Sequence, residues 1–467
     1  MKVKLFISIL IPLLVLLMPT SWIPIAGITV IEHRMLAIFF AALFFWILEP
    51  IPIFATSVVV VILELLMISD KGLIWLRGSG EMFGTPLKYA ALLQTFAAPV
   101  IMLFLGGLFL AAAATKYKLD VNLARVMLKP FGKNPSMVLL GFMLITAVFS
   151  MFMSNTATTA LMLAIVAPVL QLFKADDPGK IAFVLSVPFA ANVGGMGTPI
   201  GTPPNAIGIK YLTGNMAVTF GEWTTFGVPF AIIMLLAVWG LLITFSKPRE
   251  KSMELAVKGK FRTDWKAIVV YVTFALSIIL WLTGSVHGLN SYTVAMLPIG
   301  VFITTGILTV EDMKKLSWDV LWLIAGGIAL GDGLENTGLS KHIVESIPFA
   351  TLSPWMIMIS ATMLAVVMST FISNTATANL LLPIMAALAA TIPSLADVGG
   401  AKMLIIAIAF SCSFAMALPI STPPNALAYA TGMVDNKQMV KTGSIVGILG
   451  LLLLYVMVFV LKAVGFV

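Results

Sequence analysis

The sequence Ser-Asn-Thr-Ala-Thr stands at residues 154–158 and again at residues 373–377. Each copy lies near the middle of an apolar segment of about 36 residues, 137–173 and 355–390. One straight helix of that length is too long for a bilayer, which needs about 20 residues. The motif is too apolar in its surroundings to be a surface turn between two full spans. We therefore predict two re-entrant hairpins, each with two half-length helices that meet at a polar tip inside the membrane.

A second motif, Thr-Pro-Pro-Asn-Ala, follows each copy at residues 202–206 and 422–426. Paired prolines cannot lie inside a regular helix, because each removes an N–H and its ring clashes with the preceding turn. In the first copy four glycines between residues 194 and 201 add to the break, so residues 192–201 are expected to be unwound. Broken spans at corresponding positions of two repeats indicate the substrate site of a secondary transporter.

A third pair of landmarks, Gly-Gly at 106–107 and 326–327, has almost the same offset. Three matched landmarks indicate an internal repeat of about half the chain. Five predicted membrane crossings separate the two Gly-Gly pairs. Because five is an odd number, the second copy is expected to be inverted relative to the first.

Composition places the chain in lipid. Of the 467 residues 60% are hydrophobic and 10% are charged, and the mean hydropathy is +1.07. A soluble protein has about a quarter charged residues. The net charge of +8 does not indicate nucleic-acid binding, because the basic residues gather in short loops between apolar runs, where they act as orientation signals.

Eleven apolar runs outside the two hairpins are expected to span the membrane. They lie at about 1–22, 33–49, 51–69, 90–113, 181–211, 223–246, 265–283, 290–308, 319–338, 401–431 and 442–466. The first run is read as an uncleaved span rather than a signal peptide. The loop 247–266 carries seven basic residues and is therefore expected to be cytoplasmic. That puts the N-terminus in the cytoplasm and the C-terminus outside, although Lys71, Arg77 and Lys88 would then lie on the outer side.

The four motifs contain hydroxyl, amide and carbonyl groups, and no Lys, Arg, Asp, Glu or His. Hard oxygen ligands suit Na⁺. Helix N-termini and amide N–H groups suit carboxylates. An anion held without a basic side chain needs other positive charge, which co-bound cations supply. Exchange of one dianion for another would avoid this need, so the motifs leave symport and exchange both open.

Paired Ser-Asn-Thr motifs followed by Thr-Pro-Pro-Asn motifs resemble the divalent anion/sodium symporter family, the INDY and bacterial dicarboxylate transporters. The likeness is strong at 104–120, 150–206, 323–339 and 369–426. It implies a homodimer with a static scaffold and a moving transport part, an elevator. The residues it implies for two Na⁺ sites are Ser150, Ser154, Asn155, Gly201, Ser369, Ser373, Asn374 and Ser421. The residues it implies for substrate carboxylates are Asn155, Thr156, Asn374, Thr375, Thr202, Pro203, Thr422 and Pro423. Ser421 replaces the glycine of the first copy, a change that a backbone carbonyl ligand survives.

The same resemblance divides the chain into parts. The scaffold is expected at 1–113 and 265–338, and the transport part at 134–246 and 353–467. Interfacial arms at 114–133 and 339–352 are expected to join them, and 247–264 is the cytoplasmic loop.

The leading prediction is a sodium-coupled symporter of C4 dicarboxylates such as succinate, malate or fumarate, a multi-pass protein of the cytoplasmic (inner) membrane. A sodium-independent dicarboxylate exchanger of the same fold is the nearest alternative, and citrate or sulfate as substrate stays open. An enzyme is not expected, because no acid–base pair or metal cluster lies in the broken segments. Asp332 and Glu335 lie near the end of a predicted span and are not assigned to the site.

Overall fold

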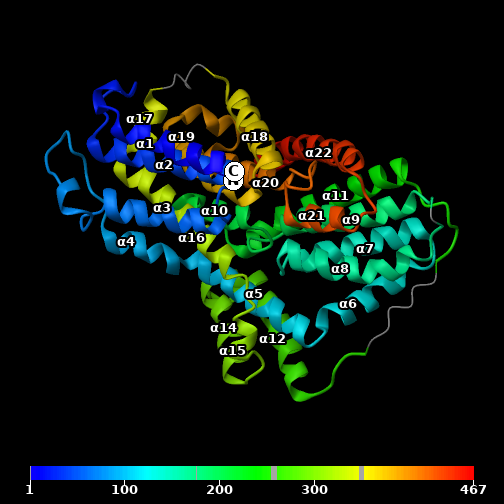
Figure 1. Cartoon of the computed structure of the whole chain (residues 1–467). Coiled ribbons are helices and arrows are strands. Elements are labelled where there is room, and N and C mark those ends of the chain that lie inside the picture. The colour runs from blue at the N-terminus through cyan, green and yellow to red at the C-terminus, as the bar shows by residue number, and fades with distance from the viewer. Residues whose placement is uncertain (1, 175, 254–259, 347–351, 467) are drawn as a thin grey trace.

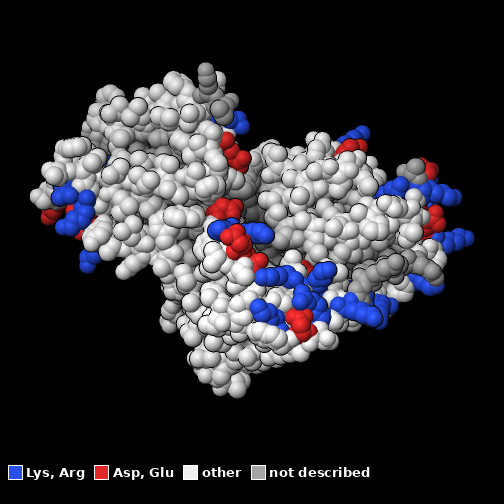
Figure 2. Space-filling view, turned by 60° about the horizontal axis from the view of Figure 1, so that its bottom comes forward, with Lys and Arg blue, Asp and Glu red and all other residues white. Residues whose placement is uncertain are grey.

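The computed structural model describes residues 2–174, 176–253, 260–346 and 352–466. This part of the chain is helical, and its one β-type feature is an isolated bridge between Ser69 and Leu87. Seven of its helices are long and apolar enough to cross a membrane. The space-filling view in Figure 2 shows charged side chains in a few groups, with wide uncharged areas between them. The predicted class, an all-helical membrane protein, is confirmed.

In each half of the chain the Gly-Gly, Ser-Asn-Thr and Thr-Pro-Pro-Asn landmarks lie on helices in the same order, and Figure 1 shows these helices. The first half contains α1 (Lys2–Leu17), α2 (Val30–Leu48), α3 (Ile53–Met67), α4 (Tyr89–Gln94), α5 (Pro99–Lys116), α6 (Leu119–Leu128), α7 (Pro135–Ser150), α8 (Asn155–Leu170), α9 (Gly179–Gly195), α10 (Pro203–Tyr211) and α11 (Phe220–Phe245). The second half contains α12 (Trp265–Leu282), α13 (Gly284–His287), α14 (Ser291–Thr304), α15 (Val310–Met313), α16 (Trp318–Thr337), α17 (Leu339–Glu345), α18 (Pro354–Phe371), α19 (Asn374–Thr391), α20 (Gly400–Ser413), α21 (Pro423–Ala430) and α22 (Asn436–Ala463).

Both Ser-Asn-Thr motifs lie at the turn of a helical hairpin, α7–α8 and α18–α19. The arms have 16, 16, 18 and 18 residues, about 24–27 Å each at 1.5 Å per residue. They are therefore longer than the half-length helices that the sequence analysis predicted. The helices are longer because the apolar sequence on either side of each tip continues without a residue that ends the helix. Pro168 and Pro383 lie inside their helices.

Both predicted breaks are present. α9 ends at Gly195 and α10 begins at Pro203, while α20 ends at Ser413 and α21 begins at Pro423. The prolines occupy the first helical position, where a missing N–H leaves no hydrogen bond unmade. The break in the first copy is shorter than the predicted 192–201, because Asn192 to Gly195 remain helical.

The two repeats exchange their short helices. α10 packs against α19 and α20 of the second repeat, and α21 packs against α8 and α9 of the first. Each Thr-Pro-Pro-Asn helix therefore rests on the hairpin of the other repeat. This exchange brings all four motifs to one place at the interface between the repeats.

The Gly-Gly pairs allow close packing of α5 and α16 against neighbouring segments. A side chain on Gly106 would collide with Ala295 of α14, and one on Gly326 would collide with Ser57 of α3. The second glycine of each pair faces the motif-bearing segments instead: Gly107 faces Ile200 in the break before α10, and Gly327 faces Asn379 of α19. Parts of the predicted cytoplasmic loop (254–259) and of the second arm (347–351) lie outside the described residues.

Candidate functional site

A cavity of about 340 Å³ lies where the four motifs meet. The lining residues that belong to the motifs or directly precede them are Ser154, Asn155, Thr156, Gly201, Thr202, Pro203, Ser373, Asn374, Thr375, Ser421, Thr422, Pro423 and Pro424. These residues open the helices α8, α10, α19 and α21 or directly precede them. Four helix N-termini therefore meet at one cavity. Their free N–H groups and partial positive charge favour a bound anion.

Asn155 lies against a cluster of oxygen atoms. One end of its side-chain amide is 2.6 Å from Ser150 Oγ, 3.0 Å from the Gly201 carbonyl oxygen and 3.3 Å from the Ala191 carbonyl oxygen. With nitrogen at this end, the two N–H groups of the amide can donate to two of these three oxygens. With oxygen there, the Ser150 hydroxyl donates to it, and the Gly201 and Ala191 carbonyl oxygens lie close to it with no donor in between. The residues therefore fit a Na⁺ ion, which takes hard oxygen ligands.

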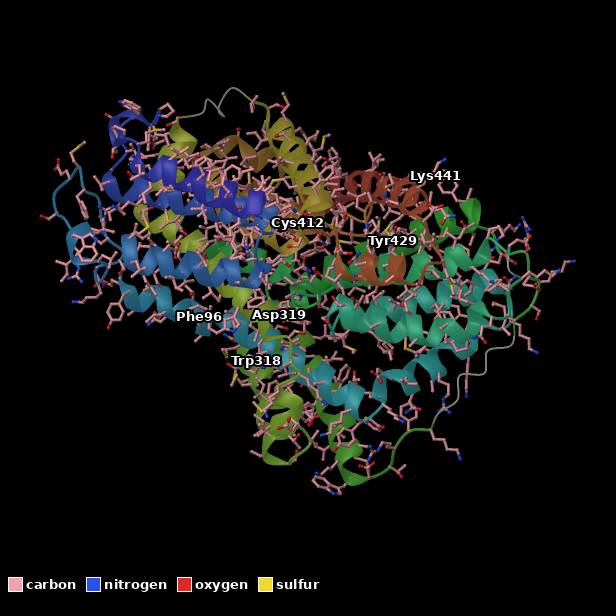
Figure 3. All side chains as sticks on the ribbon, viewed as in Figure 1. Phe96, Trp318, Asp319, Cys412, Tyr429 and Lys441 are labelled. Atoms are coloured by element: carbon pink, nitrogen blue, oxygen red, sulfur yellow. The ribbon has the colours of Figure 1, made fainter. Side chains whose placement is uncertain are left out.

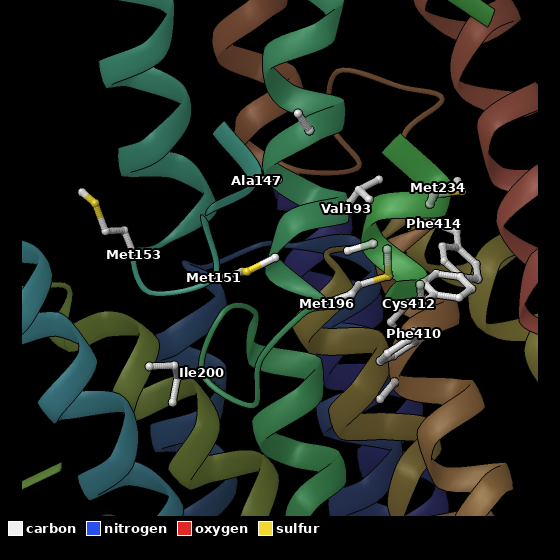
Figure 4. Packing of buried hydrophobic residues seen from close by; sticks show 14 of the residues in the cluster. Ala147, Met151, Met153, Val193, Met196, Ile200, Met234, Phe410, Cys412 and Phe414 are labelled. Atoms are coloured by element: carbon white, nitrogen blue, oxygen red, sulfur yellow. The ribbon is translucent and has the colours of Figure 1, made fainter. Parts of the chain in front are cut away.

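The loop 196–202 brings Gly201 to this cluster. Figure 4 shows the loop as a non-helical segment carrying Ile200, with Met151 and Met153 of the hairpin turn beside it. A Cβ on Gly195 would lie 2.7 Å from Asn155 Oδ1 and 2.9 Å from the Gly201 carbonyl oxygen. The absence of side chains at Gly195 and Gly201 thus allows the loop backbone to approach Asn155.

The second repeat offers a matching set of buried oxygens. Asn374 Oδ1 has no hydrogen-bond partner at 9% exposure, and the fully buried Ser369 Oγ has only the weakly bonding thiol of Cys412 beside it. The hydroxyls of Ser411 and Ser413 in α20 are likewise buried without a partner. Buried polar groups are rarely left unpaired, because desolvation costs about 1–3 kcal/mol each. A cation bound beside such oxygens would provide a missing partner.

Ser154 and Ser373 cap their helices. The Oγ of Ser154 accepts from Ala157 N at 3.2 Å, and the Oγ of Ser373 accepts from Ala376 N at 3.2 Å. Both serines do cap, whereas the following asparagines turn into the oxygen clusters. A capping hydroxyl keeps a free lone pair, so it remains available as a ligand.

The asparagine of each Thr-Pro-Pro-Asn motif closes the break before it. Asn205 Nδ2 donates to the carbonyl oxygens of Thr198 (2.9 Å) and Gly195 (3.2 Å). Asn425 Nδ2 donates to the carbonyl oxygens of Met416 (3.0 Å) and Leu418 (3.0 Å). The sequence analysis placed both residues in the motif but gave them no role. The repetition of an asparagine directly after the prolines in both copies could have indicated this role.

One hydrogen bond crosses between the repeats beside the cavity. Asn192 Nδ2 donates to Thr422 Oγ1 at 3.2 Å, and the same hydroxyl accepts from Asn425 N at 3.3 Å. Asn192 also lines the cavity. Sequence analysis included it in the unwound segment and not in the site.

Asp319 is the one charged residue among those described that line the cavity. It lies in the first turn of α16, beside Trp318, as labelled in Figure 3. Asp319 was not predicted from the sequence, because it lies outside the four motifs and reaches the cavity only through the packing of α16. A carboxylate here opposes a bound anion and favours cations.

Comparison with known proteins establishes the family. Residues 1–464 match the model described as the sodium:sulfate symporter transmembrane region. The chain belongs to this family. The resemblance predicted from the motifs is thereby confirmed at the level of the family, and the protein is a membrane transporter and not an enzyme.

Several curated relatives cover most of the chain. A "sodium-dependent dicarboxylate transporter SdcS" of Staphylococcus saprophyticus is 32% identical over 463 residues, covering 89% of this chain and 83% of the relative. The SdcS of Staphylococcus aureus strain USA300 is 30% identical over 458 residues with the same coverage. An uncharacterised transporter of Haemophilus influenzae is 34% identical over 372 residues, covering 74% of this chain and 78% of the relative.

Solved structures with low sequence identity share the fold. The YdaH transporter of Alcanivorax borkumensis has a TM-score of 0.57 at 16% identity, covering 81% of this chain and 88% of its own. MtrF of Neisseria gonorrhoeae, from a class described as antimetabolite efflux pumps, has a TM-score of 0.53 at 12% identity, covering 88% and 96%. At these identities the likeness concerns the fold alone.

Proposed function

We propose that this protein is a secondary transporter that couples the uptake of C4 dicarboxylates to Na⁺ across the cytoplasmic (inner) membrane. The observation that carries the proposal is the cavity at which four helix N-termini meet, flanked by two clusters of buried oxygens. The names of the staphylococcal relatives support the same cation and the same class of substrate.

The substrate is bound at the centre of the cavity. Its carboxylates accept hydrogen bonds at the two hairpin tips, from the side chains of Asn155, Thr156, Asn374 and Thr375 and from nearby backbone N–H groups. The starts of α10 and α21, at Thr202-Pro203 and Thr422-Pro423, close the cavity from the other two sides. A volume of about 340 Å³ is at the small end of the range for ligand pockets, which suits a four-carbon diacid.

Sodium supplies the charge that the side chains lack. One ion is held by Ser150, Ser154, Asn155 and Gly201, and a second by Ser369, Ser373, Asn374 and Ser421. Helix dipoles contribute about 0.3–2 kcal/mol each, and Asp319 works against a dianion. Two monovalent cations cancel the charge of a dicarboxylate, and this favours symport over exchange without sodium.

The transport step is an elevator movement within a homodimer. The segments 134–246 and 353–467 carry the cavity and move, while 1–113 and 265–338 form the scaffold. A second pocket shares Leu108, Met153 and Ser154 with the cavity and continues to Lys116 and Lys315. Lys116 ends α5 and Lys315 follows α15, and both lie at span ends that face the cytoplasm in the topology expected from the loop 247–266. The pocket therefore supports a cytoplasm-facing state, with the N-terminus on the same side and the C-terminus outside.

The test is uptake of radiolabelled succinate into proteoliposomes, with and without an inward Na⁺ gradient and with and without internal succinate. Uptake into empty vesicles that requires the Na⁺ gradient is expected. Uptake that ignores Na⁺ and requires internal dicarboxylate would instead show an exchanger. Competition by unlabelled citrate and sulfate in the same vesicles measures the substrate range, and stronger competition by sulfate than by succinate would overturn the proposed substrate class.

A further inference from the structure

Four ionisable side chains gather in the membrane-embedded interface between α3, α10 and α16. Lys210 lies in the last turn of α10, the short helix that begins with the first Thr-Pro-Pro-Asn motif. Its amine donates to Asp332 Oδ1 at 2.5 Å and to the Ile328 carbonyl oxygen at 3.0 Å, both on α16. Tyr211 and Glu64 complete the group, and the proposed binding site uses none of the four.

Glu64 is the unusual member of this group. It belongs to α3, is fully buried, and neither carboxylate oxygen has a hydrogen-bond partner. It lies within electrostatic range of both Lys210 and Asp332. The position beside it is Gly333, where a Cβ would come within 2.7 Å of Glu64 Oε1. A buried carboxyl without a partner is unfavourable, so its retention needs a reason.

The ion pair also has an unusual place in the architecture. Three side-chain hydrogen bonds join the described residues of the proposed transport part to those of the proposed scaffold. The transport part is 134–246 and 353–466, and the scaffold is 2–113 and 265–338. Two come from Lys210, and the third is from Asn379 Nδ2 to the Leu323 carbonyl oxygen at 3.1 Å. All three end on α16. On the opposite side Gly107 of α5 meets the apolar Ile200.

We propose that Lys210 is a positioning residue with two alternative carboxylate partners, Asp332 in the conformation seen here and Glu64 in the opposite one. The proposal rests on the elevator movement, in which α10 slides past α3 and α16. A charge-assisted bond must break for α10 to leave its present position. Arrival at a second carboxylate compensates for that loss and gives Glu64 the partner it lacks. The pair thus sets the balance between the two end states.

The test compares Asp332→Asn and Glu64→Gln, with Glu335→Gln as the matched control. Glu335 lies on the same helix but is exposed. The reporter is a cysteine in place of Ala157, which lines the second pocket, in a background where the buried Cys412 is alanine. A membrane-impermeant maleimide is applied from the face that carries Lys315, and its rate of reaction measures the fraction of protein open to that face.

Asp332→Asn is expected to lower the reaction rate and Glu64→Gln to raise it, each by about tenfold, the effect of about 1.4 kcal/mol on an equilibrium. Both are expected to slow succinate uptake, and Glu335→Gln to change neither. A Glu64→Gln protein with the wild-type reaction rate and wild-type uptake would refute the second partner. If Glu64→Gln does not fold, the charge-inverted triple variant Lys210→Glu, Asp332→Lys, Glu64→Lys must regain uptake that Lys210→Glu has lost, and its failure overturns the proposal.

Succinate binding separates this inference from the proposed function. Purified wild type and both variants are expected to bind succinate in the presence of Na⁺, because none of the changes touches the cavity. Absence of binding in the wild type would refute the proposed substrate. The maleimide rates need no substrate and would still show whether Lys210 has two partners.

Discussion

Asn205 and Asn425 hold equivalent places in the two repeats, and each fastens the non-helical segment before it. Asn205 Nδ2 reaches the Thr198 carbonyl oxygen at 2.9 Å, and Asn425 Nδ2 reaches the Leu418 carbonyl oxygen at 3.0 Å. Both residues are fully buried. A proline-broken helix leaves carbonyl groups without partners, and here one amide per repeat satisfies them.

We therefore expect Asn205→Ala and Asn425→Ala each to destabilise the protein by about 1–3 kcal/mol, because buried carbonyls lose their donor. Thermal unfolding in detergent should show a lower Tm for both, and succinate uptake should fall. The matched control is Asn336→Ala, since Asn336 is exposed and bonds only to its own helix. An unchanged Tm in both variants would contradict the role assigned to these amides.

Asn155→Ala and Asn374→Ala are expected to abolish Na⁺-dependent uptake while folding and dimerisation persist. Each change removes the amide from an oxygen cluster that we assign to Na⁺. Equilibrium binding of succinate at varied Na⁺ should show the defect as a lost or strongly right-shifted sodium dependence. Wild-type uptake by both variants would rule out the hairpin tips as the site.

Substitution by alanine should have different effects on uptake at Gly201 and at Ser421, its counterpart in the second repeat. A Cβ on Gly201 would collide with the backbone of Gly195, so Gly201→Ala must displace the loop that carries a proposed sodium ligand. Ser421 already has a side chain, whose hydroxyl donates to the Thr370 carbonyl oxygen at 2.8 Å. We expect Gly201→Ala to remove uptake and Ser421→Ala to reduce it only severalfold. Equal losses in the two variants would contradict this asymmetry.

Gly327 tests the contact between α16 and the second hairpin. A methyl group there would collide with the Asn379 amide, which is buried and bonded to Leu323. Gly327→Ala is expected to cost about 1–3 kcal/mol of stability through overpacking and to slow uptake. Gly300→Ala on α14 is the control, because a Cβ there meets no atom within 4 Å. Equal stability and equal uptake of the two variants would contradict the importance of this contact.

A pH prediction comes from the ion pair between Lys116 and Asp312, 2.6 Å apart. Partial burial acts to raise the pKa of Asp312, but hydrogen bonds from Lys116 and Thr309 outweigh it and lower the pKa to about 2. The folded pKa is below the unfolded value of 3.8, so the carboxylate stabilises the fold above pH 3.8 and loses that effect as pH falls towards 2. The Tm difference between wild type and Asp312→Asn should therefore be constant from pH 8 to pH 5. A difference that changes within that range would assign the effect to another group.

The features that the sequence alone predicts are those determined locally by the motifs. The doubled Ser-Asn-Thr and Thr-Pro-Pro-Asn motifs predicted the repeat, the hairpin turns and both helix breaks. These features follow from local chemistry, because proline lacks an N–H and Ser or Asn before a helix caps it. The predicted length of the hairpin helices was wrong, because no residue near the motifs determines where each helix ends.

What only the tertiary structure decided is how segments distant in sequence meet. The exchange of α10 and α21 between the repeats, the bond from Asn192 to Thr422, and the place of Asp319 at the cavity depend on packing between whole helices. So does the pairing of Lys210 with Asp332 beside the buried Glu64. In a chain that is apolar nearly throughout, many helix faces can pack against one another, and only close fits such as Gly327 against Asn379 select the arrangement that forms.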